Sequence, residues 1–221
     1  MNVDKIILKA FLGTIAAIGA LFVFLTVALV GIYPETMQEI SYDLGMDAPC
    51  IWFAERTYKR HGRIEDIAFA MEVAIADGNH KKVVSCGNKV KNDDEFSNYC
   101  KAKDEQIKAS VVGKENEEQL LIALGEYDEY VYGQICVSQY ELGQKQEAID
   151  NAFAWTGDAF PNNNAVVRVL IQAKKDSDTQ WFEKVVEKMQ QIDVPTEDQE
   201  YYDEIFLKLC AASDTESANN S

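Results

Sequence analysis

Apolar residues recur at intervals of three and four positions along most of the chain after Pro34, and this spacing constrains the fold more than any other feature. One face of an α-helix repeats at that interval, whereas a half-buried β-strand alternates at every second residue. Runs of alternating Val, Ile and Thr are missing, and the 221 residues include only four prolines. The sequence therefore predicts an all-α fold.

The clearest pair of predicted helices lies between residues 130 and 164. The first helix ends at Gly143, because glycine readily adopts the left-handed conformation that closes many helices. The second helix begins near Glu147 and stops before Pro161, which cannot continue a helix. Apolar and aromatic residues follow helical spacing on the first helix, at Tyr132, Ile135, Cys136 and Tyr140. Two helices joined by so short a turn are expected to pack as an antiparallel hairpin.

A weaker copy of this pattern follows. A helix is expected over residues 166–171, and Ser177 with Gln180 three residues later has the form of a capping box that begins the next helix. From Gly143 to Asp178, the two turn positions, the step is 178 − 143 = 35 residues. A step of this size is typical of helical repeat proteins.

The remaining helices are placed by the same apolar spacing. A short amphipathic helix and linker are expected over residues 34–49, a helical domain over 50–211 and a disordered, polar tail over 212–221. Within the domain, further helices are predicted over residues 51–61, 64–75, 81–91 and 94–103, and a C-terminal capping helix begins at Thr196. Between residues 79 and 130 the number of hairpins stays open.

Residues 129–164 resemble the tetratricopeptide repeat family. The resemblance rests on residues that stand in the order of the family motif, namely Tyr132, Leu142, Gly143, Ala148, Phe153 and Pro161. The interval from Ala148 to Pro161 is one residue longer than the usual motif, and Cys136 stands where a small residue is normal. The resemblance implies a stack of antiparallel helix hairpins, an α-solenoid, in which each hairpin covers the apolar face of the next.

The N-terminal part of the chain has no charged residue from residue 10 to residue 33. As one helix this run would rise about 36 Å, so the sequence predicts a transmembrane helix over 10–33. A cleaved signal peptide is the alternative, but its apolar region is usually shorter. Lys5 and Lys9 precede the run, so the positive-inside rule predicts a cytosolic N-terminus over residues 1–9. The expectation is a single-pass signal-anchor protein of the cell membrane with an extracytoplasmic C-terminal domain.

The sequence contains no recognisable catalytic or cofactor-binding motif. The two histidines, His61 and His80, both fall at helix ends and lack a paired metal-ligand spacing. No phosphate-binding glycine loop or nucleophile motif occurs either. A formal net charge of −16 disfavours nucleic acid as a partner. We therefore expect no enzyme activity, no cofactor, no metal and no small-molecule substrate.

Five cysteines leave at least one thiol unpaired if the others form disulfides. Cys86 and Cys100 lie seven residues on either side of residue 93, so an antiparallel hairpin of helices 81–91 and 94–103 would let them face each other. The sequence predicts a possible disulfide between them. The alternative is that both are small buried apolar residues.

The family resemblance implies a partner-binding groove lined by the first helix of each hairpin. The residues carried over to that groove are Trp52, Arg56, Lys59, Tyr130, Val137, Tyr140, Arg168, Gln172 and Lys175. The leading hypothesis is a membrane-anchored protein–protein interaction module, a scaffold or chaperone-like accessory subunit, that binds a peptide or helix of another protein. A permanent structural subunit of a larger membrane complex is the alternative, and an enzyme with an unrecognised site is the weakest.

Overall fold

The computed structural model of the chain describes residues 31–91, 93–114, 127–154 and 164–191, together with short pieces at 14–15, 18–21, 23–24 and 27–28. Within these ranges the regular structure is α-helical, and no strand occurs. The chain divides into two compact units, residues 1–73 (unit 1) and residues 74–221 (unit 2), and each is described by itself. The predicted C-terminal capping helix and the tail over 212–221 lie outside the described residues.

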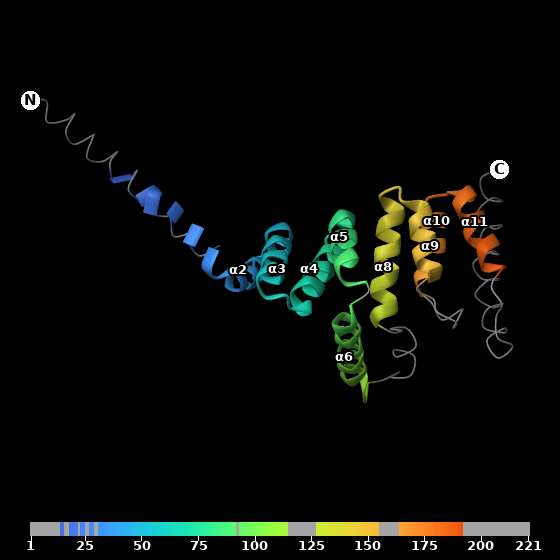
Figure 1. Cartoon of the computed structure of the whole chain (residues 1–221), viewed down its shortest axis with the longest axis horizontal. Helices are drawn as coiled ribbons and strands as arrows, with labels where there is room; N and C mark the ends of the chain where they lie inside the picture. Colours follow the sequence, from blue (N-terminus) through green and yellow to red (C-terminus); the bar gives the residue numbers. More distant parts are fainter. Residues whose placement is uncertain are drawn as a thin grey trace, which may run out of the picture. The chain divides into compact units, whose positions relative to one another are not determined.

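The helices follow one another with short connections (Figure 1). Unit 1 contains α2 (Pro34–Asp43), α3 (Asp47–His61) and most of α4 (Ile64–Ala76). The helices of unit 2 are α5 (His80–Val90), α6 (Asp94–Val111), α8 (Tyr127–Glu141), α9 (Lys145–Ala154), α10 (Asn164–Lys175) and α11 (Thr179–Met189). The helical spacing of apolar residues thus predicted the class of regular structure in the described part of the chain.

The prediction of a membrane span is contradicted. In the described part of the chain, no helix is both long and apolar enough to cross a bilayer. Between residues 10 and 33 the described helical pieces before Gly31 contain at most four residues, about 6 Å of helix, whereas a span needs about 30 Å. The transmembrane helix over 10–33, the single-pass signal anchor and the location derived from them are therefore corrected. Residues 1–9 lie outside the described residues.

Unit 1 is organised by the packing of α2 on α3. The buried face of α3 includes Ile51, Phe53 and Ala54, which recur at helical spacing. Tyr42 on α2 meets Phe69 on α4 edge-on, with ring centroids 5.4 Å apart. Arg63 joins the same two helices, because its guanidinium donates to Glu35 at 2.9 Å and to Asp66 at 3.0 Å. These contacts order the three helices of unit 1 around one apolar face.

Four helices end in the same backbone motif. In each, a residue with positive φ follows the helix, and the two amides of the turn donate back to carbonyls of the last turn, as in a Schellman motif. At Gly143, for example, Gly143 N donates to Tyr140 O at 2.9 Å and Gln144 N to Gln139 O at 2.9 Å. The positive-φ residues are Gly45, Gly78, Gly143 and Ser177. Gly143 and Ser177 are equivalent, so the structural step is 177 − 143 = 34 residues rather than the predicted 35.

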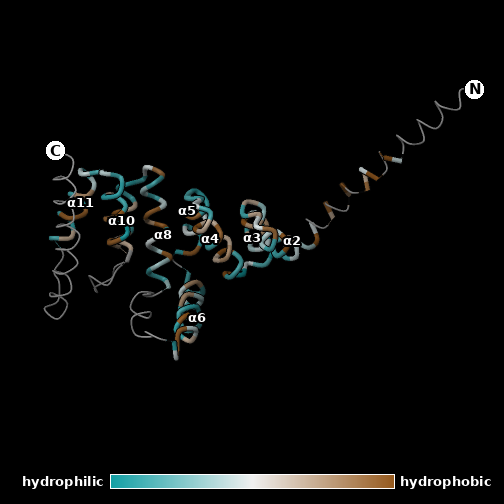
Figure 2. Tube along the Cα trace, turned by 180° about the vertical axis from the view of Figure 1, so that it is seen from behind, coloured by the Kyte–Doolittle hydropathy of each residue, from teal (hydrophilic) through white to brown (hydrophobic). Residues whose placement is uncertain are grey.

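Helix α8 occupies the centre of unit 2, because it packs against α5, α6, α9 and α10. Its buried residues cover most of its circumference, and they include Val131, Ile135 and Cys136. Figure 2 shows hydrophobic and hydrophilic residues along both α8 and α10. An apolar cluster shared by α8, α9, α10 and α11 forms the core of this part, with Ala148, Ile149, Val166, Leu170, Val185 and Met189 among its buried members. Helix packing rather than any single helix therefore hides the apolar surface.

Polar contacts tie the hairpin of α8 and α9 together inside this core. Gln139 is fully buried, and its side-chain amide is satisfied at both ends. Its Nε2 donates to Glu147 Oε1 at 3.1 Å, and its Oε1 accepts from Asn151 Nδ2 at 3.0 Å. An unsatisfied amide at this depth would cost about 1–3 kcal/mol, so these two bonds fix the register of α8 against α9.

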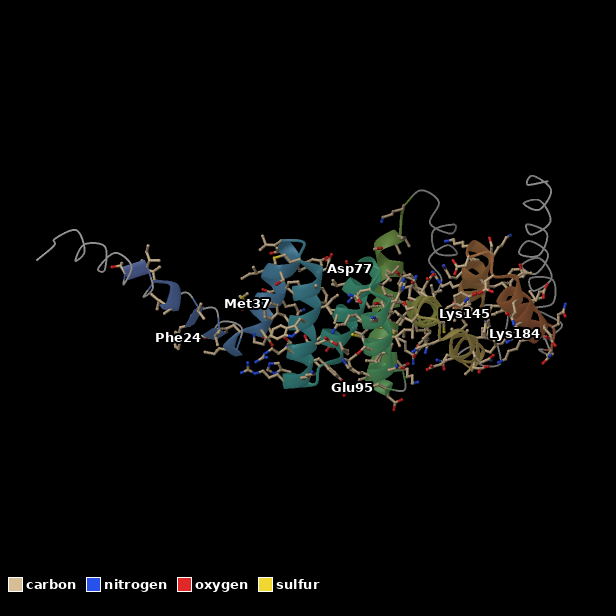
Figure 3. The ribbon with its side chains drawn as sticks, turned by 90° about the horizontal axis from the view of Figure 1, so that it is seen from above. Phe24, Met37, Asp77, Glu95, Lys145 and Lys184 are labelled. Atoms are coloured by element: carbon tan, nitrogen blue, oxygen red, sulfur yellow. The ribbon has the colours of Figure 1, made fainter. Side chains whose placement is uncertain are left out.

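A second polar contact joins this hairpin to the next one. The Tyr140 hydroxyl donates to Asp178 Oδ2 at 2.9 Å, and the ammonium group of Lys145, labelled in Figure 3, pairs with the same carboxylate oxygen. The hydrogen bond from Lys145 holds the pKa of Asp178 below its usual value. Burial raises the pKa of the Tyr140 phenol, and the bond to Asp178 adds to this shift. The turn at Gly143 is thereby held against the turn at Ser177.

Replacing Tyr140 by Phe should lower the free energy of unfolding by about 1 kcal/mol, because the ring stays in the core but the hydroxyl bond to Asp178 is lost. Urea denaturation followed by circular dichroism measures this change. Tyr42→Phe is the matched control, since the Tyr42 ring is exposed and the change should be within about 0.5 kcal/mol. Equal losses in the two variants would contradict the role of the Tyr140 hydroxyl.

Candidate protein-interaction surfaces

Three of the predicted partner-binding residues form one exposed surface on α3. Trp52, Arg56 and Lys59 are four and three residues apart, so they lie on the same side of the helix, and all three are exposed. The Arg56 guanidinium lies over the Trp52 ring, 5.3 Å from its centroid. The other neighbour of the ring is Phe53, which meets it edge-on at 4.9 Å. We call Trp52, Arg56 and Lys59 the α3 surface.

The C-terminal half of α3 is basic although the chain as a whole is acidic. Arg60 and His61 follow Lys59 directly, but both are engaged within unit 1. Arg60 Nη1 donates to Ile32 O at 3.1 Å, and His61 Nε2 lies 3.4 Å from Glu35 Oε1. Basic residues in the last turn also interact favourably with the helix dipole. Arg56 differs, because it lies in the middle of the helix and contacts an exposed aromatic ring.

Further exposed apolar residues lie on α2 and on the turn that follows it. Large apolar side chains usually lose exposure on folding, and several of them together mark an interaction surface more often than single ones do. The exposed residues of this segment are Ile40, Tyr42, Leu44 and Met46. The sequence analysis treated them only as an amphipathic lead-in. Their exposure could not be foreseen, because it depends on which face of α2 packs against α3.

The predicted residues of unit 2 do not all share a surface. Tyr130 on α8 and Arg168 on α10 are brought together, with the guanidinium 5.0 Å from the ring centroid. Gln172 is half-buried and donates to Glu141 on α8, and Lys175 is exposed at the end of α10. Val137 is half-buried as well. Tyr140 is 1% exposed and belongs to the core, so its side chain does not face a partner.

Gly133 shapes the contact between Tyr130 and Arg168, and the sequence analysis missed it. A Cβ atom at Gly133 would lie 2.4 Å from Arg168 Cδ, so only glycine leaves room for the arginine stem to cross α8. The Nε atom of Arg168 is buried there and has no hydrogen-bond partner. A glycine inside a helix was the available signal, because such a residue often marks close packing.

A row of tyrosine rings leads to Arg168 from the neighbouring helix α6. The ring centroids of Tyr99 and Tyr127 are 6.3 Å apart, and those of Tyr127 and Tyr130 are 6.4 Å apart. All three side chains are half-buried. At the other end of the row, Lys103 Nζ lies 5.6 Å from the Tyr99 ring. We call Tyr99, Tyr127 and Tyr130 the tyrosine row.

Metal-ligand chemistry finds no support in the described ranges. No group of three or more His, Cys, Asp or Glu side chains there is placed to hold a metal ion. His80 Nδ1 lies 3.1 Å from Ser138 Oγ, and His61 lies near Glu35. Both histidines therefore have partners that are themselves parts of helices, as residues at helix ends often do.

The cysteines do not form the predicted arrangement. Cys50, Cys86, Cys100 and Cys136 are buried thiols, and no disulfide joins the cysteines of the described residues. In Figure 1, α6 extends below α5 instead of folding back along it, and both helices pack on α8. The hairpin that would have made Cys86 and Cys100 face each other is therefore not formed. Burial raises the pKa of the Cys136 thiol to about 12.

We expect the four described thiols to react slowly with iodoacetamide in the folded protein and completely in denaturant. Burial removes them from the reagent, and a raised pKa leaves little thiolate at Cys136. The Cys210→Ser variant, unfolded without reductant, should consume four equivalents, as mass spectrometry can count. Two equivalents would reveal a disulfide and contradict the structure.

Comparisons with known proteins give no relative. No family model matches the chain, and neither a characterised protein nor a solved structure is significantly similar to it. The resemblance to tetratricopeptide repeats therefore remains a prediction from the sequence.

Proposed function

We propose that the chain is a protein–protein interaction module and that the α3 surface binds its partner. The observation that carries this proposal is the position of Trp52, which is 45% exposed although a tryptophan side chain gains much from burial. Trp and Arg are the residue types most enriched among those that dominate binding energy. The partner is a peptide segment or helix of another protein.

The contacts of Trp52 favour binding because they hold the ring in place before a partner arrives. Phe53, which is buried, supports one edge of the ring, and Arg56 covers it from the same helix. A side chain that is already ordered loses less conformational entropy on association. The ring therefore offers a large apolar contact on a rigid helix at low entropic cost.

A permanent subunit of a larger assembly is the second candidate. The exposed residues Ile40, Tyr42, Leu44 and Met46 favour it, because obligate interfaces are more apolar than transient ones. The two candidates differ in the behaviour of the isolated chain. A docking module is monodisperse alone, whereas a permanent subunit copurifies with its neighbours at a fixed ratio.

Site-specific photo-crosslinking in the producing cells tests the proposal. A photoreactive phenylalanine analogue at Ala48, an exposed position one turn before Trp52, should give one discrete adduct. Trp52→Ala should reduce this adduct more than tenfold, because loss of a dominant contact costs about 2 kcal/mol or more. Glu39→Ala, an exposed change on α2, is the matched control and should leave the adduct unchanged.

The same analogue at Glu187, exposed on α11, reports on adducts that form without regard to the α3 surface. An adduct at Ala48 that persists in Trp52→Ala, or that also forms from Glu187, would contradict binding at the α3 surface.

A further inference from the structure

Arg168 lacks the partner that a half-buried guanidinium normally has. Its Nε atom is buried and accepts no compensation from any hydrogen-bond acceptor, and an unmet buried donor costs about 1–3 kcal/mol. Its observed partner is the Tyr130 ring, 5.0 Å away. In the described part of this strongly acidic chain, no carboxylate forms an ion pair with it. An acceptor supplied from outside would complete the site.

The arginine is held in position, which separates it from an ordinary surface residue. Its stem crosses α8 at Gly133, where a Cβ atom would lie 2.4 Å from Cδ and 3.1 Å from Nε. The guanidinium therefore emerges beside Tyr130 with few alternative positions. Planar guanidinium groups bind carboxylates through paired hydrogen bonds, and a fixed orientation favours that geometry.

The spacing of the tyrosine row matches an extended peptide. Neighbouring ring centroids are 6.3 and 6.4 Å apart. Alternate residues of an extended strand are about 6.6 Å apart, and those of a polyproline II helix about 6.2 Å apart. A peptide laid along the row would thus place every second side chain over a tyrosine ring, with Arg168 beyond Tyr130.

We propose that the tyrosine row and Arg168 bind an extended peptide segment that carries one Asp or Glu side chain for Arg168. Apolar residues or prolines two and four positions from the acid lie over Tyr130 and Tyr127. One carboxylate suits a single guanidinium in a chain of net charge −16, whereas a polyanion would be repelled. This surface belongs to unit 2 and does not depend on the α3 surface.

Selection from a random peptide library displayed inside a carrier loop tests the proposal with the full chain as bait. We expect enrichment of Asp or Glu at one position, with apolar residues or Pro two and four positions away. With Arg168→Gln as bait, the acidic preference should disappear. Lys175→Gln, which removes an exposed charge from the same helix, is the matched control and should leave the enrichment intact.

A double-mutant cycle on a selected peptide then measures the contact. Arg168→Gln and the change of the acid to its amide should each weaken binding about tenfold, and the two together should weaken it little more. Circular dichroism checks the fold of each variant. Arg168→Lys, which keeps the stem through the Gly133 notch, replaces Arg168→Gln if the latter is unfolded, and should bind at least threefold more weakly.

The proposal is overturned if the library gives no binder, or if acidic residues are not enriched. It is also overturned if the acidic preference survives in Arg168→Gln, or if additive losses in the cycle show that the two groups do not touch. Enrichment that requires a free peptide C-terminus would exclude a side chain as the bound group. Loss of binding in Trp52→Ala with Arg168 intact would place the contact on the α3 surface instead.

Discussion

The packing of α8 against four other helices is the constraint on which unit 2 depends. A helix buried over most of its surface cannot keep polar groups there without partners, and α8 meets this condition residue by residue. Gln139 is bonded to two residues of α9, Tyr140 to Asp178, and Ser138 lies within hydrogen-bond distance of His80. The polar contacts therefore select one arrangement among the many that apolar packing alone would allow.

The same helix also positions the candidate binding residues of unit 2. Its C-terminal half is in the core, whereas the side chains of residues 127–130 are half-buried. Gly133 stands between these two parts and lets Arg168 pass close to the α8 backbone. A residue that fills the core of a helix stack and a residue that binds a partner are thus separated by only one turn. Substitutions that test binding must be chosen on the exposed side of that boundary.

Much of the helical pattern was predictable from the sequence, because apolar spacing and positive-φ turn residues act locally. Gly143 ends α8 as expected, whereas Ser177 was read as part of a capping box and instead takes the turn position that glycine usually fills. Contacts between distant helices were not predictable. The pairing of Tyr130 with Arg168 was not foreseen as a contact, Tyr140 was assigned to a groove and lies in the core, and Cys86 and Cys100 were paired through a hairpin that does not form. The membrane span was wrong because uncharged composition was taken as sufficient for a long helix.

Native-state hydrogen exchange, resolved by residue with nuclear magnetic resonance, tests the central role of α8 most directly. Amides of Ile135 and Cys136 should exchange more slowly than those of α11, which packs mainly on α10, because the most widely packed helix opens last. Their exchange should approach the rate set by global unfolding of unit 2. If the α8 amides exchange as fast as those of α11, α8 is not the element that holds unit 2 together.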